Sequence, residues 1–72
     1  MNVRMKIQTR LDTLETQLKA GEHLRSAEGV IAVLTTIASV SRFWRVMTDE
    51  ERDFVNAAKV AVEDQLPWRK VH

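Results

Sequence analysis

Hydrophobic and polar residues recur at helical spacing along most of the chain, and the first such segment covers residues 3–20. Its apolar positions are separated by four, three and four residues, which places a single seam on one face of a helix: Ile7, Leu11, Leu14 and Leu18. Charged and amide side chains fill most of the positions between them. We therefore predict a helix over 3–20 that packs its narrow seam on a neighbouring helix or on its copy in another subunit.

A glycine follows this segment directly. Gly21 comes after Lys19 and Ala20, and a glycine after a basic last turn commonly ends a helix. Ser26 is then a suitable N-cap for the next helix, with Glu28 in its first turn. Two interpretations remain open. The chain breaks at Gly21, or one continuous helix runs through it at a cost of about 1 kcal/mol relative to alanine.

The central stretch, residues 30–44, is the longest apolar run and contains no acidic residue. Seven of the eleven residues in 30–40 are β-branched, which favours a strand by propensity. A lone strand would leave its backbone groups unpaired, however, and no second strand candidate exists in the sequence. The apolar residues also fall on one helical arc: Val30, Ile31, Val33, Leu34, Ile37, Ala38, Val40, Trp44 and Met47. We therefore predict a helix over 26–47.

The apolar arc of this central helix is wide. It covers roughly 200° of the helix, more than the stripe of an ordinary surface helix. The rest of the helix carries small residues, Ala32, Thr36 and Ser39, which permit close approach of another helix. Three short helices cover this much apolar surface poorly, so we predict a homodimer, and the small-residue side is where we expect a partner.

The residues that follow predict a third helix with well-defined ends. Thr48 and Glu51 have the spacing of a capping box, in which each side chain accepts a hydrogen bond from the other residue's backbone N–H. The buried face would then consist of Phe54, Val55, Ala58, Ala61, Val62 and Leu66. Arg52 and Lys59 would lie on its solvent side. Pro67 ends the predicted helix, which covers 49–66, and leaves a tail over 67–72.

Length and composition limit the chain to one small domain, residues 1–72. A chain of this size buries only about 60% of its unfolded surface, so it depends on a good core or on a partner subunit. Cysteine is absent, which excludes disulfides and suits the cytoplasm. We predict an all-α fold, a three-helix bundle or a helical hairpin plus an N-terminal helix, that completes its core by homodimerisation.

Charge and hydropathy exclude some classes of partner. The 11 basic and 10 acidic residues leave a net charge of +1, which produces no broad field for nucleic acid or for an anionic membrane. The central apolar run is shorter than the roughly 20 residues that span a bilayer. We therefore expect a cytoplasmic protein that does not bind or cross a membrane.

The sequence offers no catalytic constellation. The acids of 49–53 are similar to the carboxylate clusters of helical metal sites, but the capping box and the helix dipole explain them. His23 and His72 are the two histidines, and neither follows a glutamate by three residues, as a di-iron bundle requires. Ser39 and Ser41 are expected to bond back to helix carbonyls. We predict no enzyme activity, no metal site and no cofactor.

Aromatic and basic residues are interleaved at two places: Arg42, Phe43, Trp44 and Arg45, and then Trp68 and Arg69. Tryptophan and arginine are enriched at protein-binding hot spots, and both also serve single-stranded nucleic-acid binding. A structural role competes with both, since Trp44 falls on the core arc and the arginines suit a helix C-terminus. We predict an unidentified protein partner for these residues, with nucleic-acid binding as the alternative.

The second half of the chain combines an acidic helix start, an alanine pair, a carboxylate pair and a tryptophan: 50–53, 57–58, 63–64 and Trp68. In these features residues 42–68 resemble small uncharacterised all-helical proteins of tailed phages that infect marine cyanobacteria. The resemblance covers about a third of the chain. It implies a phage accessory protein and implies no particular activity, cofactor or site residue.

Overall fold

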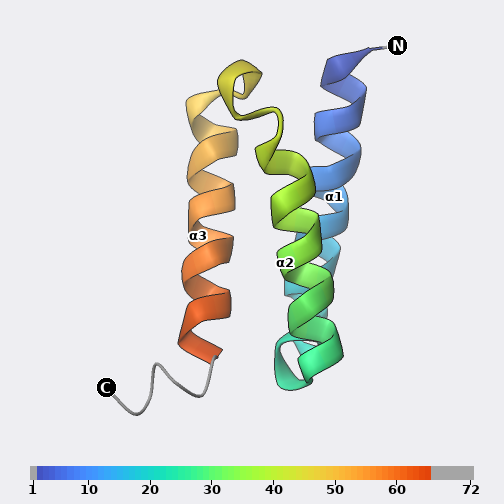
Figure 1. Cartoon of the computed structure of the whole chain (residues 1–72), viewed down its shortest axis with the longest axis vertical. Helices are drawn as coiled ribbons and strands as arrows, with labels where there is room; N and C mark the ends of the chain where they lie inside the picture. Colours follow the sequence, from blue (N-terminus) through green and yellow to red (C-terminus); the bar gives the residue numbers. More distant parts are fainter. Residues whose placement is uncertain (1, 66–72) are drawn as a thin grey trace.

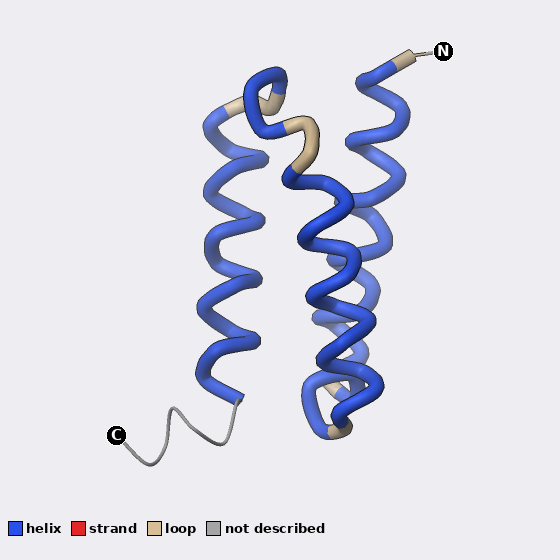
Figure 2. Tube along the Cα trace, in the orientation of Figure 1, coloured by secondary structure: helices blue, strands red, loops and turns tan. Residues whose placement is uncertain are grey.

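Helices make up nearly all of the chain that the computed structural model describes, which is residues 2–65 without the side chains of residues 22, 23 and 65 (Figure 1). Their order is α1 (Val3–Ala20), η1 (Glu22–Arg25), α2 (Ala27–Ser41), η2 (Trp44–Val46) and α3 (Asp49–Gln65), where η marks a 3₁₀-helix. Figure 2 shows no strand within this described part. The predicted all-α class is therefore confirmed, whereas the predicted tail and Leu66 lie outside the described residues.

α2 is the central element of the bundle. It packs against α1 on one side and α3 on the other, while α1 and α3 contact each other little. α2 and α3 form an antiparallel hairpin, and α1 lies behind α2 in the view of Figure 1. The prediction that the central helix lies between the other two is confirmed, and α1 packs its seam within its own chain.

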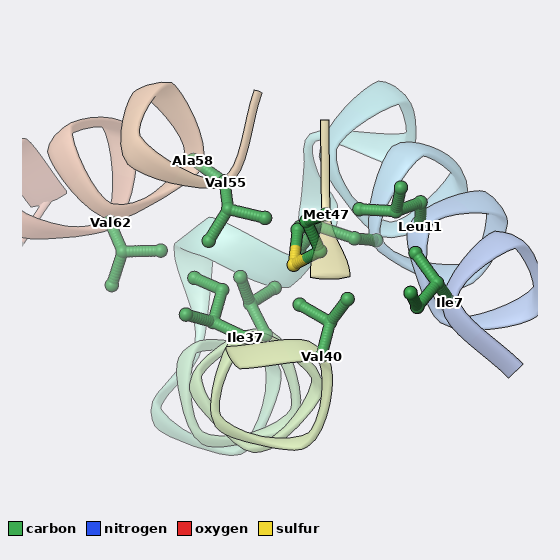
Figure 3. Close-up of a cluster of buried hydrophobic side chains, with 10 residues drawn as sticks. Ile7, Leu11, Ile37, Val40, Met47, Val55, Ala58 and Val62 are labelled. Carbon is green, nitrogen blue, oxygen red and sulfur yellow. The ribbon is translucent and has the colours of Figure 1, made fainter. Parts of the chain in front are cut away.

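The core is a single cluster to which all three helices contribute. The side chains of α2 point between α1 and α3 (Figure 3). Almost all of the core residues are less than 5% exposed: Ile7, Leu11 (7%), Leu14, Val33, Ile37, Val40, Met47, Val55, Ala58 and Val62. Each of these aliphatic residues was expected on a buried face from its spacing. Fully burying one aliphatic side chain contributes about 1.5–3 kcal/mol, so this cluster dominates the stability of the fold.

Side-chain caps define the helix starts. The Ser26 hydroxyl accepts a hydrogen bond from the Gly29 backbone N–H at 3.0 Å. The capping box is present, because the Thr48 N–H donates to Glu51 Oε1 at 2.8 Å and the Glu51 N–H donates to Thr48 Oγ1 at 3.2 Å. Asn2, which the sequence analysis did not single out, caps α1 by accepting from the Arg4 N–H at 2.9 Å.

Gly21 breaks the chain between the first two helices. Its φ of 68° is a conformation that residues with a Cβ rarely adopt, and its N–H donates to the Leu18 carbonyl. The 3₁₀ segment η1 then leads to Ser26 and α2. Of the two interpretations left open at Gly21, the structure selects the break.

The predicted end of the second helix was wrong by about six residues. α2 ends at Ser41, and 42–47 form a bend, η2 and an extended Met47 before the Thr48 cap. A helix through Met47 would leave no residues to reverse the chain before α3, and helix connections commonly take 2–8 residues. Met47 is nevertheless buried and Trp44 half-buried, because the 3₁₀ turn folds both back onto the bundle.

The two sides of α2 have different environments from those predicted. Ala32, Thr36 and Ser39, the small-residue side expected to meet a partner, are half-buried, and Arg10 Nε of α1 donates to Ser39 Oγ at 2.6 Å. The prediction that Ile31, Leu34 and Ala38 belong to the core-facing arc was wrong, because all three are exposed, Ile31 at 62% and Leu34 at 43%. Within the described residues, no helix is both long and apolar enough to cross a bilayer.

Candidate functional site

The first basic-aromatic cluster forms the connection between α2 and α3, near the N-terminal end of α1 (Figure 1). Arg42 is the C-cap of α2, Phe43 forms the bend, and Trp44 and Arg45 begin η2. The second cluster, Trp68 and Arg69, lies outside the described residues. The candidate site is therefore built from 42–46 and from the helices that pack on this connection.

Phe43 is held by α1. Its ring is half-buried, and the Arg10 guanidinium carbon lies 5.3 Å from the ring centroid. The same guanidinium donates through Nη1 to the Lys6 carbonyl and through Nε to Ser39 Oγ. Arg10 thus links α1 to the end of α2, and the Phe43 ring contributes one contact of a network within the chain.

Trp44 is held by α3. Arg52 Nε donates to the Trp44 carbonyl at 2.9 Å, and Arg52 Nη2 donates to the Arg45 carbonyl at 3.3 Å. The Arg52 guanidinium carbon and Lys59 Nζ lie 5.8 and 5.3 Å from the Trp44 ring, within cation–π range. The expected solvent-side role of Arg52 and Lys59 was wrong. The Trp44 carbonyl also accepts the Met47 backbone N–H at 3.3 Å, so Arg52 adds a second donor there and supplies a side-chain donor for the Arg45 carbonyl.

The two arginines of the connection have a different environment. The side chains of Arg42 and Arg45 are exposed, and neither forms an ion pair with any residue that the structure describes. They were expected to offset the negative end of the second helix. Arg42 does cap α2, but Arg45 lies beyond the helix end in η2. Their charges therefore remain available to a ligand outside the chain.

A shallow groove lies at the corner of the bundle where the start of α1 meets the α2–α3 connection; we call it the corner groove. Its volume is about 370 Å³, and its lining comes from the start of α1 and from the α2–α3 connection: Val3, Ser41, Arg42, Phe43, Trp44, Arg45 and Val46. Val3 is 43% exposed and Val46 58% exposed, so the groove carries two aliphatic side chains in contact with solvent. The groove thus combines apolar surface with two positive charges that have no ion-pair partner in the part of the chain that the structure describes.

Ser41 contributes a polar atom to the groove. Its Oγ is buried and has no hydrogen-bond partner among residues 2–65, where the expected bond to a helix carbonyl is absent. The corresponding bond is formed elsewhere on α2, where Thr35 and Thr36 donate to the carbonyls of Ile31 and Ala32. A hydroxyl in this position can donate to or accept from a group bound in the groove.

Sequence reasoning missed three residues of this groove: Ser41 and the two valines, Val3 and Val46. Val3 has the spacing that continues the seam of α1 by one turn, four residues before Ile7, yet it is 43% exposed. In Figure 1 the start of α1 lies to one side of the α2–α3 connection. Val46 lay within the predicted second helix, and only the 3₁₀ turn exposes it. The sequence signal available for both was an apolar residue at the margin of a predicted element.

Two acidic residues at the start of α3 are engaged by other side chains of the chain. Asp49 is bound at 3.5 Å by Arg52, and the Glu51 carboxylate is engaged by Thr48 and by Arg4. No group of three or more histidines, aspartates or glutamates is placed to hold a metal ion among residues 2–65. The chemistry that the described groove supports is non-covalent binding.

Comparisons with protein-family models, with curated proteins and with solved structures find no match to this chain.

Proposed function

We propose that this protein is a helical protein-interaction module, an adaptor or regulator, that binds an acidic, apolar segment of another protein in the corner groove. The single observation that carries the proposal is the combination within this groove of exposed Val3 and Val46 with Arg42 and Arg45, which have no ion-pair partner among the described residues. Aliphatic surface takes up apolar side chains, and the guanidinium groups select carboxylates.

The charge of the site determines the type of segment. A peptide with aliphatic residues would bury the two valines, while an aspartate or glutamate beside them would pair with Arg45. Exposed ion pairs add little affinity on their own, so we expect apolar burial to supply most of the binding free energy. The carboxylates then fix the register of the segment and exclude basic sequences.

Nucleic-acid binding is the alternative that the same arginines raise. Single-stranded binders stack bases on free aromatic faces beside a positively charged groove. Here cations of the chain itself lie over both aromatic rings, with Arg10 over Phe43 and Arg52 and Lys59 over Trp44. The net charge of +1 also provides little attraction for phosphates. These observations favour a protein partner.

The biological setting is part of the same proposal. The resemblance of residues 42–68 to small phage proteins and the absence of cysteine support a phage accessory protein that acts in the host cytoplasm. A small module of this kind would act by occupying a segment of a larger protein, without catalysis.

A display library of random 12-residue peptides, selected on the immobilised full-length chain, tests the proposed function. We expect enrichment of peptides that combine aspartate or glutamate with aliphatic residues. Their binding should be lost with Val46→Glu, which places a like charge in the groove, and weakened with Arg45→Glu. Asn56→Glu, an exposed change on α3, is the matched control and should bind as the natural chain does.

Two outcomes would contradict the proposal. The first is a selection that yields no enrichment, or yields peptides whose binding is unaffected by Val46→Glu. The second is tight binding of single-stranded DNA with a steep dependence on salt, lost with Arg42→Glu and Arg45→Glu, which would establish the nucleic-acid alternative.

A further inference from the structure

The exposed side of α2 carries a second apolar seam, separate from its core face. Four residues on it are exposed and spaced by four, three and four positions: Ala27, Ile31, Leu34 and Ala38. This is the spacing of a helix–helix contact seam. Glu28 is the single charged residue between Ala27 and Ser41, so the side of α2 that faces solvent lacks the charges that usually cover it.

The order of residue sizes along this seam is symmetric. Two small residues, Ala27 and Ala38, enclose two large ones, Ile31 and Leu34, and the midpoint of both pairs lies between residues 32 and 33. A two-fold axis through that midpoint places Ile31 of one chain against Leu34 of a second copy and Ala27 against Ala38. Contacts between identical subunits related by a two-fold axis have this self-complementary form.

The two-fold axis makes the two α2 helices antiparallel, and the charges at the ends of the seam favour this antiparallel orientation. Glu28 and Arg42 are both exposed, and neither is ion-paired within residues 2–65. In the antiparallel pair, Arg42 of the second copy lies level with a point five residues before Glu28. At about 1.5 Å per residue, the two are about 7.5 Å apart along the helix axis. Helical side chains lean toward their own N-terminus, so these two lean toward each other and can meet. A parallel pair would instead set Glu28 level with its copy.

We infer that two copies of this chain associate through antiparallel pairing of their α2 helices, with Ile31 and Leu34 at the centre and a Glu28–Arg42 ion pair at each end. The apolar seam lies apart from the corner groove, although Arg42 belongs to both surfaces, and the inference does not depend on the proposed peptide binding. A single pair of helices buries less than the about 1,600 Å² of a standard interface, so the association is reversible and depends on concentration.

Sedimentation equilibrium of the full chain tests the association. The natural chain should change from the mass of one chain to twice that mass as concentration rises. The double variant Ile31→Glu, Leu34→Glu should remain a single chain, with an unchanged helical circular dichroism spectrum because both positions are exposed. Val60→Glu, at a 56% exposed position on α3, is the matched control and should still associate.

Charge reversal and cross-linking test the orientation. Glu28→Arg and Arg42→Glu should each weaken the association, and the chain that carries both changes should regain it. The natural chain has no cysteine. A chain with Ala27→Cys mixed with a chain with Ala38→Cys should therefore form a disulfide-linked pair on mild oxidation, and much faster than either chain alone.

Three results would overturn the inference. One is a single-chain mass over the whole soluble concentration range. Another is association that survives Ile31→Glu, Leu34→Glu. The third is preferential cross-linking of the Ala27→Cys chain to itself, which indicates a parallel pair. Peptide binding is measured independently, because Val46→Glu should abolish it without altering association, and Ile31→Glu, Leu34→Glu should have the reverse effect.

Discussion

The Nη2 nitrogen of Arg4 lies 2.7 Å from both carboxylate oxygens of Glu51, which is 47 positions further along the chain. The same carboxylate accepts the Thr48 N–H as part of the capping box. One glutamate therefore caps α3 and also connects that helix to the first turn of α1. α1 and α3 share few other contacts, so this pair is one of the direct links between them.

Removing either partner should reveal the two roles of Glu51. We expect Glu51→Ala to lower the free energy of unfolding by about 1–2 kcal/mol, since it removes the cap as well as the ion pair. Arg4→Met should cost less than about 1 kcal/mol, because the Arg4 side chain is 49% exposed and its charge is screened by water. Urea unfolding followed by circular dichroism measures both. An Arg4→Met loss as large as that of Glu51→Ala would contradict the assignment.

Most of the core and the helix starts could be predicted from the sequence because they depend on local rules. Apolar spacing identified the buried faces, and the Thr48–Glu51 capping box located the start of α3 to the residue. The end of α2 could not be predicted in this way. Neither glycine nor proline marks it, and the helical apolar pattern continues to Met47. What ends α2 is the reversal of the chain, which is a property of the assembled bundle.

The candidate site could be predicted only in part, because its residues acquire their roles only when the helices pack. The interleaved Arg42–Arg45 segment indicated where to look, but the sequence could not divide its residues by role. Trp44 is held by Arg52 from α3 and Phe43 by Arg10 from α1, and both contacts exist only once the helices pack. Val3 and Val46 lie far apart in the sequence, so their shared groove is likewise a tertiary feature.

Arg52 is predicted to stabilise the α2–α3 connection more than any other basic residue of the corner. Arg52→Met removes two hydrogen bonds from a charged donor to backbone carbonyls and one cation–π contact, so we expect a loss of about 2 kcal/mol. Arg45→Met, at an exposed neighbouring position, is the control and should change stability by less than about 0.5 kcal/mol. Urea unfolding compares them, and equal losses in the two variants would refute the role of Arg52.

Two valines on α3 give a matched test of the core. Val62 is 1% exposed and Val60 is 56% exposed, although both occupy the same helix two residues apart. Val62→Ala should lower the free energy of unfolding by about 1.5–3 kcal/mol, because it removes buried methyl groups and leaves a cavity. Val60→Ala should change it by less than about 0.5 kcal/mol. Thermal unfolding by circular dichroism ranks the pair. A reversed order would place the wrong face of α3 in the core.

Gly21 gives a test in which the backbone conformation alone decides whether a substitution raises or lowers the free energy of unfolding. Its φ is 68°, and a Cβ at this position would meet no atom within 4 Å, so a substitution there affects strain without affecting packing. Gly21→Ala should destabilise the chain by about 1 kcal/mol, because positive φ is strained for an L-residue. D-alanine, introduced by chemical synthesis, prefers positive φ and restricts the unfolded chain, so it should stabilise the protein by about 0.5–1 kcal/mol. Urea unfolding of the three chains measures both changes. Equal stability of the L- and D-alanine forms would mean that the backbone at residue 21 does not hold the conformation that separates α1 from α2.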